Sequence, residues 1–275
     1  MLKKLVFVPL ICSFVATAVA QPPPEFDPEK IQTLIVTGRH VHDWRGTTPV
    51  LKQILEDTGE FEVRVAEEFR GAGPESFASY DLVVVNYYDR GANAELRWGE
   101  RADRALEEFV RSGKGLVLYH LALGAFNGWT EYERMSGANW RPNMGHHSPR
   151  HDFEVDIEDN DHPITRGLRS PLSITNDELY ANLQRHDGVD MHMLGTAWDD
   201  HSLYTERVRQ PIPGPGLTQP ILWATRFGDG RVFVTTLGHA RENVEADAFA
   251  MTFARGAEWA ATGDVTLPIP AEFAE

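Results

Sequence analysis

Short apolar runs alternate with amphipathic stretches through the first half of the chain. Uninterrupted aliphatic and β-branched runs predict buried strands, and apolar residues recurring every three or four positions predict helices. The predicted strands are Ile31–Val36, Phe61–Ala66, Leu82–Val85 and Leu116–Tyr119. Helices are predicted at Val50–Thr58, after the cap and proline of Thr47-Thr48-Pro49, and at Arg97–Ser112. Strands and helices joined by short links predict a single α/β domain with a doubly wound, mostly parallel sheet and helices on both faces.

The second half of the chain has a less regular pattern. It contains predicted strands at Asp152–Ile157 and Met191–Ala197 and a hairpin-like pair at Pro220–Thr225 and Gly230–Thr236. Apolar residues in Ala246–Ala261 have helical spacing, and this helix is expected to pack on the sheet. Residues 207–219 are rich in proline and glycine, which predicts a loop.

The N-terminus has the layout of a secretory signal peptide. Two lysines precede an apolar run, and Ala18-Val19-Ala20 supplies small residues for cleavage after Ala20. We expect residues 1–20 to be this signal, 21–30 a disordered spacer, 31–263 the domain and 264–275 a C-terminal tail. The expected location is therefore the periplasm or the exterior, with no membrane span after cleavage.

The net charge and the position of the single cysteine argue against several classes of function. The 275 residues include 41 acidic and 26 basic side chains, a net charge of −15, which argues against nucleic-acid binding. The single cysteine, Cys12, lies in the predicted signal peptide, so the exported chain would have no thiol nucleophile and no cysteine metal site. Residues 119–124, where a nucleophile elbow is expected, contain neither serine nor cysteine. A cysteine or serine hydrolase is therefore excluded.

Histidines follow several of the predicted strands. His40 and His42 come after the first strand, His120 after the fourth and His239 after the strand ending at Thr236. The carboxyl ends of parallel strands meet at one edge of a sheet, where ligands bind, so these histidines are expected to converge. The alternative is that each is a hydrogen-bonded group in the core or on the surface. His40 and His42 are also weak candidates for a divalent metal site, with a third ligand from elsewhere.

Several segments resemble the ThuA-like (trehalose utilisation) family. The most specific is Pro220–Trp223 followed by Gly230–His239, and the similarity extends from about Thr33 to Ala261. Weaker matches are Leu34–Gly38 with His40 and Asp43, Gly113–His120, and Asn176–Tyr180. The resemblance implies a flavodoxin-like α/β fold related to class I glutamine amidotransferases, lacking their cysteine. It also implies a role in bacterial sugar catabolism, including trehalose-type disaccharides and their 3-keto forms.

These observations predict an exported enzyme that acts on a sugar, keto-sugar or glycoside by histidine and glutamate acid–base chemistry, as an isomerase, a lyase or a glycoside-cleaving enzyme. The predicted catalytic residues are His120, Glu178, Tyr180 and His239, with Glu178 or His120 as base and His239 or Tyr180 as donor to the oxyanion. The predicted substrate-binding residues are His40, Asp43, Trp44, Trp129, Trp140 and His147, the tryptophans because they stack on sugar rings.

Two alternatives stay open for the same residues: a non-catalytic carbohydrate-binding module, and a metal-assisted hydrolase that uses His40 and His42. The expected partner is a small-molecule sugar, and a divalent metal is the one candidate cofactor. The sequence leaves open the identity of the sugar, the oligomeric state and the role of the insert at residues 199–219.

Overall fold

The computed structural model describes residues 26–39, 41–89, 97–204 and 216–275. The predicted signal peptide, His40 and most of the predicted loop 207–219 lie outside the described residues.

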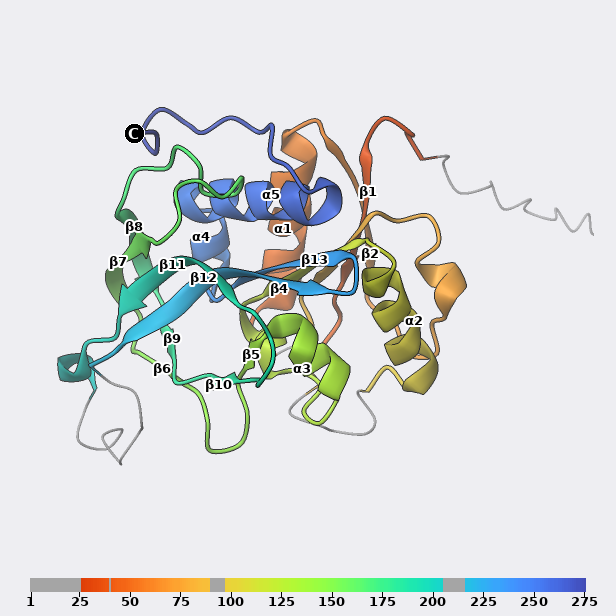
Figure 1. The fold of residues 1–275 in the computed structure, drawn as a ribbon, viewed down its shortest axis with the longest axis horizontal. Coiled ribbons are helices and arrows are strands. Elements are labelled where there is room, and N and C mark those ends of the chain that lie inside the picture. Colours follow the sequence, from red (N-terminus) through yellow and green to blue (C-terminus); the bar gives the residue numbers. More distant parts are fainter. Residues whose placement is uncertain (1–25, 40, 90–96, 205–215) are drawn as a thin grey trace, which may run out of the picture.

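A nine-stranded mixed sheet forms the centre of the domain, in the order β2-β1-β3-β4-β13-β12-β11-β7-β8 (Figure 1). The first five strands run parallel: β2 (Phe61–Ala66), β1 (Ile31–Val36), β3 (Leu82–Val85), β4 (Gly115–Tyr119) and β13 (Gly230–Thr235). The last four pair antiparallel: β12 (Thr218–Phe227), β11 (His192–Trp198), β7 (His151–Ile157) and β8 (Leu172–Asp177). The parallel half has the 2-1-3-4-5 order of a flavodoxin-like fold, which confirms the predicted fold class.

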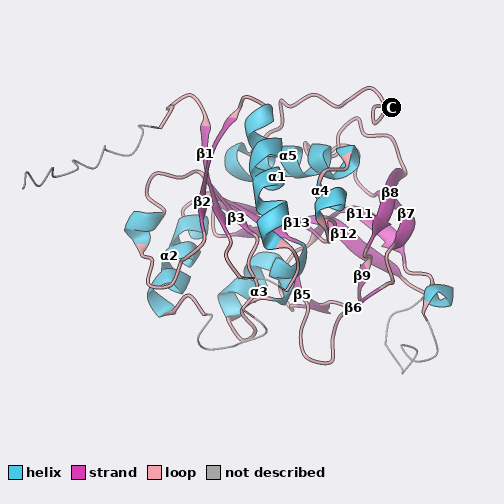
Figure 2. Ribbon diagram, turned by 180° about the vertical axis from the view of Figure 1, so that it is seen from behind, coloured by secondary structure: helices cyan, strands magenta, loops and turns pink. Residues whose placement is uncertain are grey.

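Helices cover both faces of the parallel strands (Figures 1 and 2). One face carries α1 (Trp44–Asp57), α4 (Arg241–Val244) and α5 (Asp247–Thr262), and the other carries α2 (Glu100–Arg111) and α3 (Thr130–Ser136). Successive residues of β4 alternate between the two cores: Val117 belongs to the core with α1 and α5, Leu116 to the core with α2 and α3. Burial on both faces explains why β3 and β4 are almost entirely apolar, whereas the edge strand β2 alternates apolar and charged residues.

Short elements complete the fold. Two-residue strands pair β5 (Ala138–Asn139) with β10 (Gln184–Arg185), and β6 (His146–His147) with β9 (Tyr180–Ala181). Single 3₁₀ turns lie at Pro74–Ser76, His120–Gly124 and His201–Leu203. The β6–β9 pairing places His147 opposite Tyr180, which matters for the site described below.

Helix α1 begins earlier than predicted. It starts at Trp44, because the Asp43 side chain caps it by accepting a hydrogen bond of 3.0 Å from the Gly46 amide. Pro49, expected at the first turn, lies inside the helix, where it removes one backbone hydrogen bond without ending the helix.

Both ends of the described chain pack against the domain. Residues 26–30, part of the predicted spacer, are held by a 2.7 Å hydrogen bond from the Asp27 amide to Glu62. The predicted C-terminal tail is bound through its carbonyl groups, since Phe273 accepts a hydrogen bond from the Arg169 amide and Leu267 one from Arg255. No helix within the described ranges is long and apolar enough to cross a membrane.

Candidate functional site

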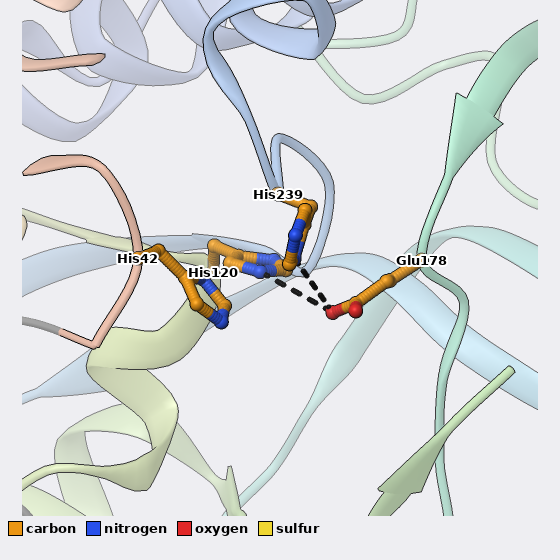
Figure 3. Close-up of side chains that lie close together, drawn as sticks. All are labelled: His42, His120, Glu178 and His239. Carbon is orange, nitrogen blue, oxygen red and sulfur yellow. Dashed lines mark ion pairs between the residues drawn. The ribbon is translucent and has the colours of Figure 1, made fainter. Parts of the chain in front are cut away.

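Loops that follow the parallel strands bring three histidines together. His42 lies between β1 and α1, His120 directly follows β4, and His239 follows β13. Glu178 arrives from the other half of the sheet, directly after β8. Figure 3 shows the four side chains pointing toward a common centre. The predicted convergence of His42, His120 and His239 is therefore observed, and Glu178 lies with them.

The Glu178 carboxylate is the centre of this cluster. Its Oε2 lies 2.9 Å from Nδ1 of His239 and 3.8 Å from Nε2 of His120, and its Oε1 lies 3.2 Å from Nδ1 of His147. The ring centroid of His42 is 4.3 Å from that of His239 and 5.0 Å from that of His120. One nitrogen of each of His42, His120 and His239 and one oxygen of Glu178 all lie within 4.8 Å of one another, a spacing that could hold a metal ion.

His120 occupies a constrained position. Its φ of 49° lies in the left-handed region that few non-glycine residues adopt, and such residues cluster at functional sites. Nδ1 is 2.7 Å from the Thr236 carbonyl oxygen, which can only accept, so the ring hydrogen is on Nδ1. Nε2 is then an acceptor, and the Tyr180 hydroxyl donates to it over 3.0 Å.

Asp177 connects the two halves of the site. Its buried carboxylate accepts hydrogen bonds from three backbone amides: Gly238 at 2.6 Å, Glu178 at 2.8 Å and His239 at 3.0 Å. The loop after β13 is thereby tied to the end of β8. No local pattern in the sequence indicates Asp177, because Gly238 and His239 lie 61 and 62 residues further along the chain.

The protonation states follow from burial and neighbouring charges. Burial, and after it the nearby His239, lowers the pKa of His42 from 6.5 to about 4, so its imidazole is neutral at pH 7. For Glu178, burial acts to raise the pKa, but the hydrogen-bonding contact with His239 and the charges of His147 and His239 outweigh it and lower the pKa. Burial raises the pKa of Tyr180 far above its usual range, so that hydroxyl remains a hydrogen donor.

A cavity of about 480 Å³ opens beside the cluster. His42, His147, Glu178 and Tyr180 line it on one side, and Trp140 contributes an aromatic wall. A larger hollow of about 740 Å³ lies elsewhere, and its lining includes three arginines, His162, His192 and the end of β12. We assign the candidate site to the smaller cavity because the buried Glu178 carboxylate lines it together with His42 and His147.

The other predicted substrate-binding residues divide into three groups. Trp140 and His147 line the cavity. Trp129 does not: its ring packs on Tyr132 in the core, and its Nε1 donates to Glu107 over 2.6 Å. Asp43 and Trp44 belong to the start of α1, where Asp43 is the cap and the buried Trp44 ring lies under the Arg45 guanidinium.

The structure therefore places Trp129, Asp43 and Trp44 outside the residues that line the cavity, and residue type alone cannot tell packing from ligand contact. His40 lies outside the described residues. Two further cavity residues, Tyr88 and Arg141, were not predicted, and only the fold brings them there.

Comparisons with known proteins agree with this architecture. The ThuA family, described as trehalose utilisation, matches residues 32–260. A ThuA-like protein from Parabacteroides merdae ATCC 43184 is 30% identical, with a TM-score of 0.74 over 89% of this chain and 95% of that one. A ThuA-like protein from Bacteroides uniformis ATCC 8492 is 15% identical, with a TM-score of 0.66 over 89% and 98% of the two chains, and shows the fold alone.

None of the curated proteins compared matches the chain. The family match spans almost the whole domain and includes all four residues of the cluster. The chain therefore belongs to the ThuA, or trehalose utilisation, family of the glutamine amidotransferase-like superfamily.

Proposed function

We propose that this protein is an enzyme of carbohydrate catabolism that transfers protons to and from a keto-sugar or its glycoside in the 480 Å³ cavity. The family supplies the context of carbohydrate utilisation. The observation that carries the proposal is one ionised carboxylate, Glu178, surrounded by histidines at the edge of a cavity with an aromatic wall. Clustered titratable groups of this kind are more typical of catalysis than of binding alone.

His147 is the best-placed base. Its Nδ1 is 2.8 Å from the Ser148 carbonyl oxygen and 3.2 Å from the Glu178 carboxylate, and both groups accept hydrogen bonds at neutral pH. The ring hydrogen is thus on Nδ1, which leaves Nε2 to accept a proton. The side chain is 45% exposed and lines the cavity. Glu178 then orients the base and stabilises its protonated form.

Tyr180 is the corresponding donor. Its hydroxyl remains protonated and already donates to His120. In a 3-keto-glycoside the acidic hydrogen is on C2, next to the ketone. We propose that His147 removes this proton, that the electron pair forms a C=C bond, and that Tyr180 donates a hydrogen bond to the developing oxyanion. The enolate electrons then return: the ketone re-forms, a C1=C2 bond forms and the bond from C1 to the aglycone oxygen breaks. The released oxygen takes its proton from His147.

Hydrogen–deuterium exchange tests this step directly. The protein is incubated in D₂O with 3-keto-trehalose and other 3-keto-glucosides, and exchange at C2 and aglycone release are followed by NMR. We expect both in the wild type and a loss of roughly 100-fold or more in His147→Gln, the usual contribution of a general base. His192→Gln, which removes an exposed histidine, is the matched control.

Two results would contradict the proposal. One is a full rate in His147→Gln. The other is binding of keto-sugars without exchange of any of them, which would favour a carbohydrate-binding module. We also propose that the protein is exported, and the intact mass of the protein recovered from its native host tests cleavage after Ala20.

A further inference from the structure

We propose that His42, His120, Glu178 and His239 form a binding site for one divalent cation of the zinc type. The sequence suggested a metal only at His40 and His42. The structure gives His42 three different partners, which come from three other loops and are brought together by the fold (Figure 3).

The spacing of the four donor atoms is close to that of a metal site. Zinc bonds of about 2.0–2.1 Å in a tetrahedron place neighbouring ligand atoms about 3.4 Å apart. The donor atoms here lie within 4.8 Å of one another, and the two measured separations from the carboxylate oxygen are 2.9 Å to His239 and 3.8 Å to His120. Small side-chain rotations, closing the widest gap by at most about 1.4 Å, would complete the site.

Hydrogen bonds from neighbouring residues hold the ligands in place, as is usual in metal sites. Histidine ligands commonly donate their second ring N–H to a carbonyl group, and His120 donates Nδ1–H to the Thr236 carbonyl. Asp177 fixes the backbone of both Glu178 and His239.

His239 faces the carboxylate directly. Its Nδ1 is buried and lies 2.9 Å from Oε2 of Glu178, a separation that is close to the spacing of two ligands of one zinc ion.

The donor types select the class of cation. Three imidazoles and one carboxylate suit zinc and the neighbouring first-row metals, whereas magnesium and calcium prefer oxygen ligands. The ionised Glu178 offsets part of the cation's charge in a partly buried position. Because His42 and Glu178 also line the cavity, a cation held by the four side chains would lie at its wall, where a fifth ligand could reach it from the substrate.

The role of this cation rests on the proposed function. A divalent ion at this position would take the ketone oxygen as a fifth ligand and so acidify the C2 hydrogen. His147 contacts Glu178 from the other carboxylate oxygen, so it remains available as the base. Binding at Nε2 of His120 would displace the Tyr180 hydroxyl, which could then donate to the substrate.

Calorimetric titration of the chelator-treated, untagged protein tests the site. We expect one zinc ion per chain, weaker binding of manganese and none of magnesium. His42→Gln and His239→Gln should each weaken zinc binding by roughly 100-fold or more, because a lost ligand is worth several kcal/mol. His192→Gln is the control, since His192 and Asp159 form a separate surface pair that could bind zinc adventitiously.

Circular dichroism shows whether each variant is folded. Absorption of the cobalt-substituted protein gives a second readout, because its visible bands should change in Glu178→Gln. The proposal is overturned if the folded wild type binds no zinc, or if the His192→Gln variant loses zinc while His42→Gln and His239→Gln retain it.

The two proposals fail in different ways. Zinc binding that needs His42 and His239, without turnover of any keto-sugar, would leave the metal site standing and refute the enzymatic function. Exchange at C2 that depends on His147 but persists at full rate in the presence of a chelator would support the proposed function and refute the role of the metal in it.

Discussion

Replacing Asp177 by asparagine should loosen the connection between the two halves of the site. The aspartate is 1% exposed and accepts hydrogen bonds from the Gly238, Glu178 and His239 amides. Asparagine has the same shape but only one acceptor oxygen. If that oxygen keeps the two bonds made by Oδ1, to Glu178 and His239, the new amide group faces the Gly238 N–H, and two donors then oppose each other.

The expected cost can be worked from these contacts. A buried donor left unsatisfied costs about 1–3 kcal/mol, and two hydrogen bonds to a charged acceptor weaken by about 1 kcal/mol each when the acceptor becomes neutral. Part of this is recovered, because burial raises the pKa of Asp177 and so penalises its charged form. We expect a net loss of about 2 kcal/mol, which in a domain of this size lowers Tm by roughly 4–8 °C.

Urea unfolding at pH 7.5 and thermal unfolding measure this loss. Asp152→Asn is the matched control: the Asp152 carboxylate also accepts from a backbone amide, that of Asn176, but it is exposed, so its replacement should cost less than about 0.5 kcal/mol. Equal stabilities of the two variants, or an Asp177→Asn protein as stable as the wild type, would refute this account of Asp177.

Three further changes test other parts of the account. Burial lowers the pKa of His162 to about 4, and its ring accepts a hydrogen bond from the Ile164 amide, so the folded protein binds the proton less well than the unfolded chain. The free energy of unfolding should therefore fall as the pH drops from 6.5 toward 4. In His162→Asn this fall should be smaller by about 1 kcal/mol, after allowance for solvent screening. Urea unfolding at pH 7 and 4.5 measures the difference, and an equal fall in the variant and the wild type would contradict the prediction. In Gly256→Ala the new Cβ would lie 2.1 Å from the Phe233 ring, so we expect a loss of about 2 kcal/mol in urea unfolding, and a gain would be the opposite of what the packing predicts. Trp140→Ala should raise KM for a keto-glycoside about fivefold with little change in kcat, and Trp140→Phe should restore most of the affinity; an unchanged KM in Trp140→Ala would remove the tryptophan from the sugar site.

The central strands of the parallel half were predictable because they are buried on both faces. Leu82–Val85 is an unbroken apolar run and Ile31–Val36 is rich in aliphatic and β-branched residues, and the limits of both strands in the structure are the predicted ones. The rule that parallel strands present ligands at their carboxyl ends then placed His42, His120 and His239 at one edge. This part of the site follows from sequence pattern alone.

The rest of the site depends on contacts between distant segments. Glu178 follows β8, a strand that the pattern did not predict and that lies at the far edge of the sheet. Only the family resemblance indicated this residue. Asp177 and the β6–β9 pair, which positions His147, have no local signal at all. The tryptophans show that residue type alone does not identify a substrate-binding residue. Trp129 packs in the core, whereas Trp140 lines the cavity, and only the fold separates the two.

Anomalous diffraction from crystals soaked in zinc tests the central claim most directly. Data collected on both sides of the zinc absorption edge locate the ion without reference to activity. We predict one strong peak within about 2.0–2.2 Å of His42, His120, Glu178 and His239. Crystals that show no peak there, or show zinc only beside His192 and Asp159, would contradict the assignment of these four side chains to one metal centre.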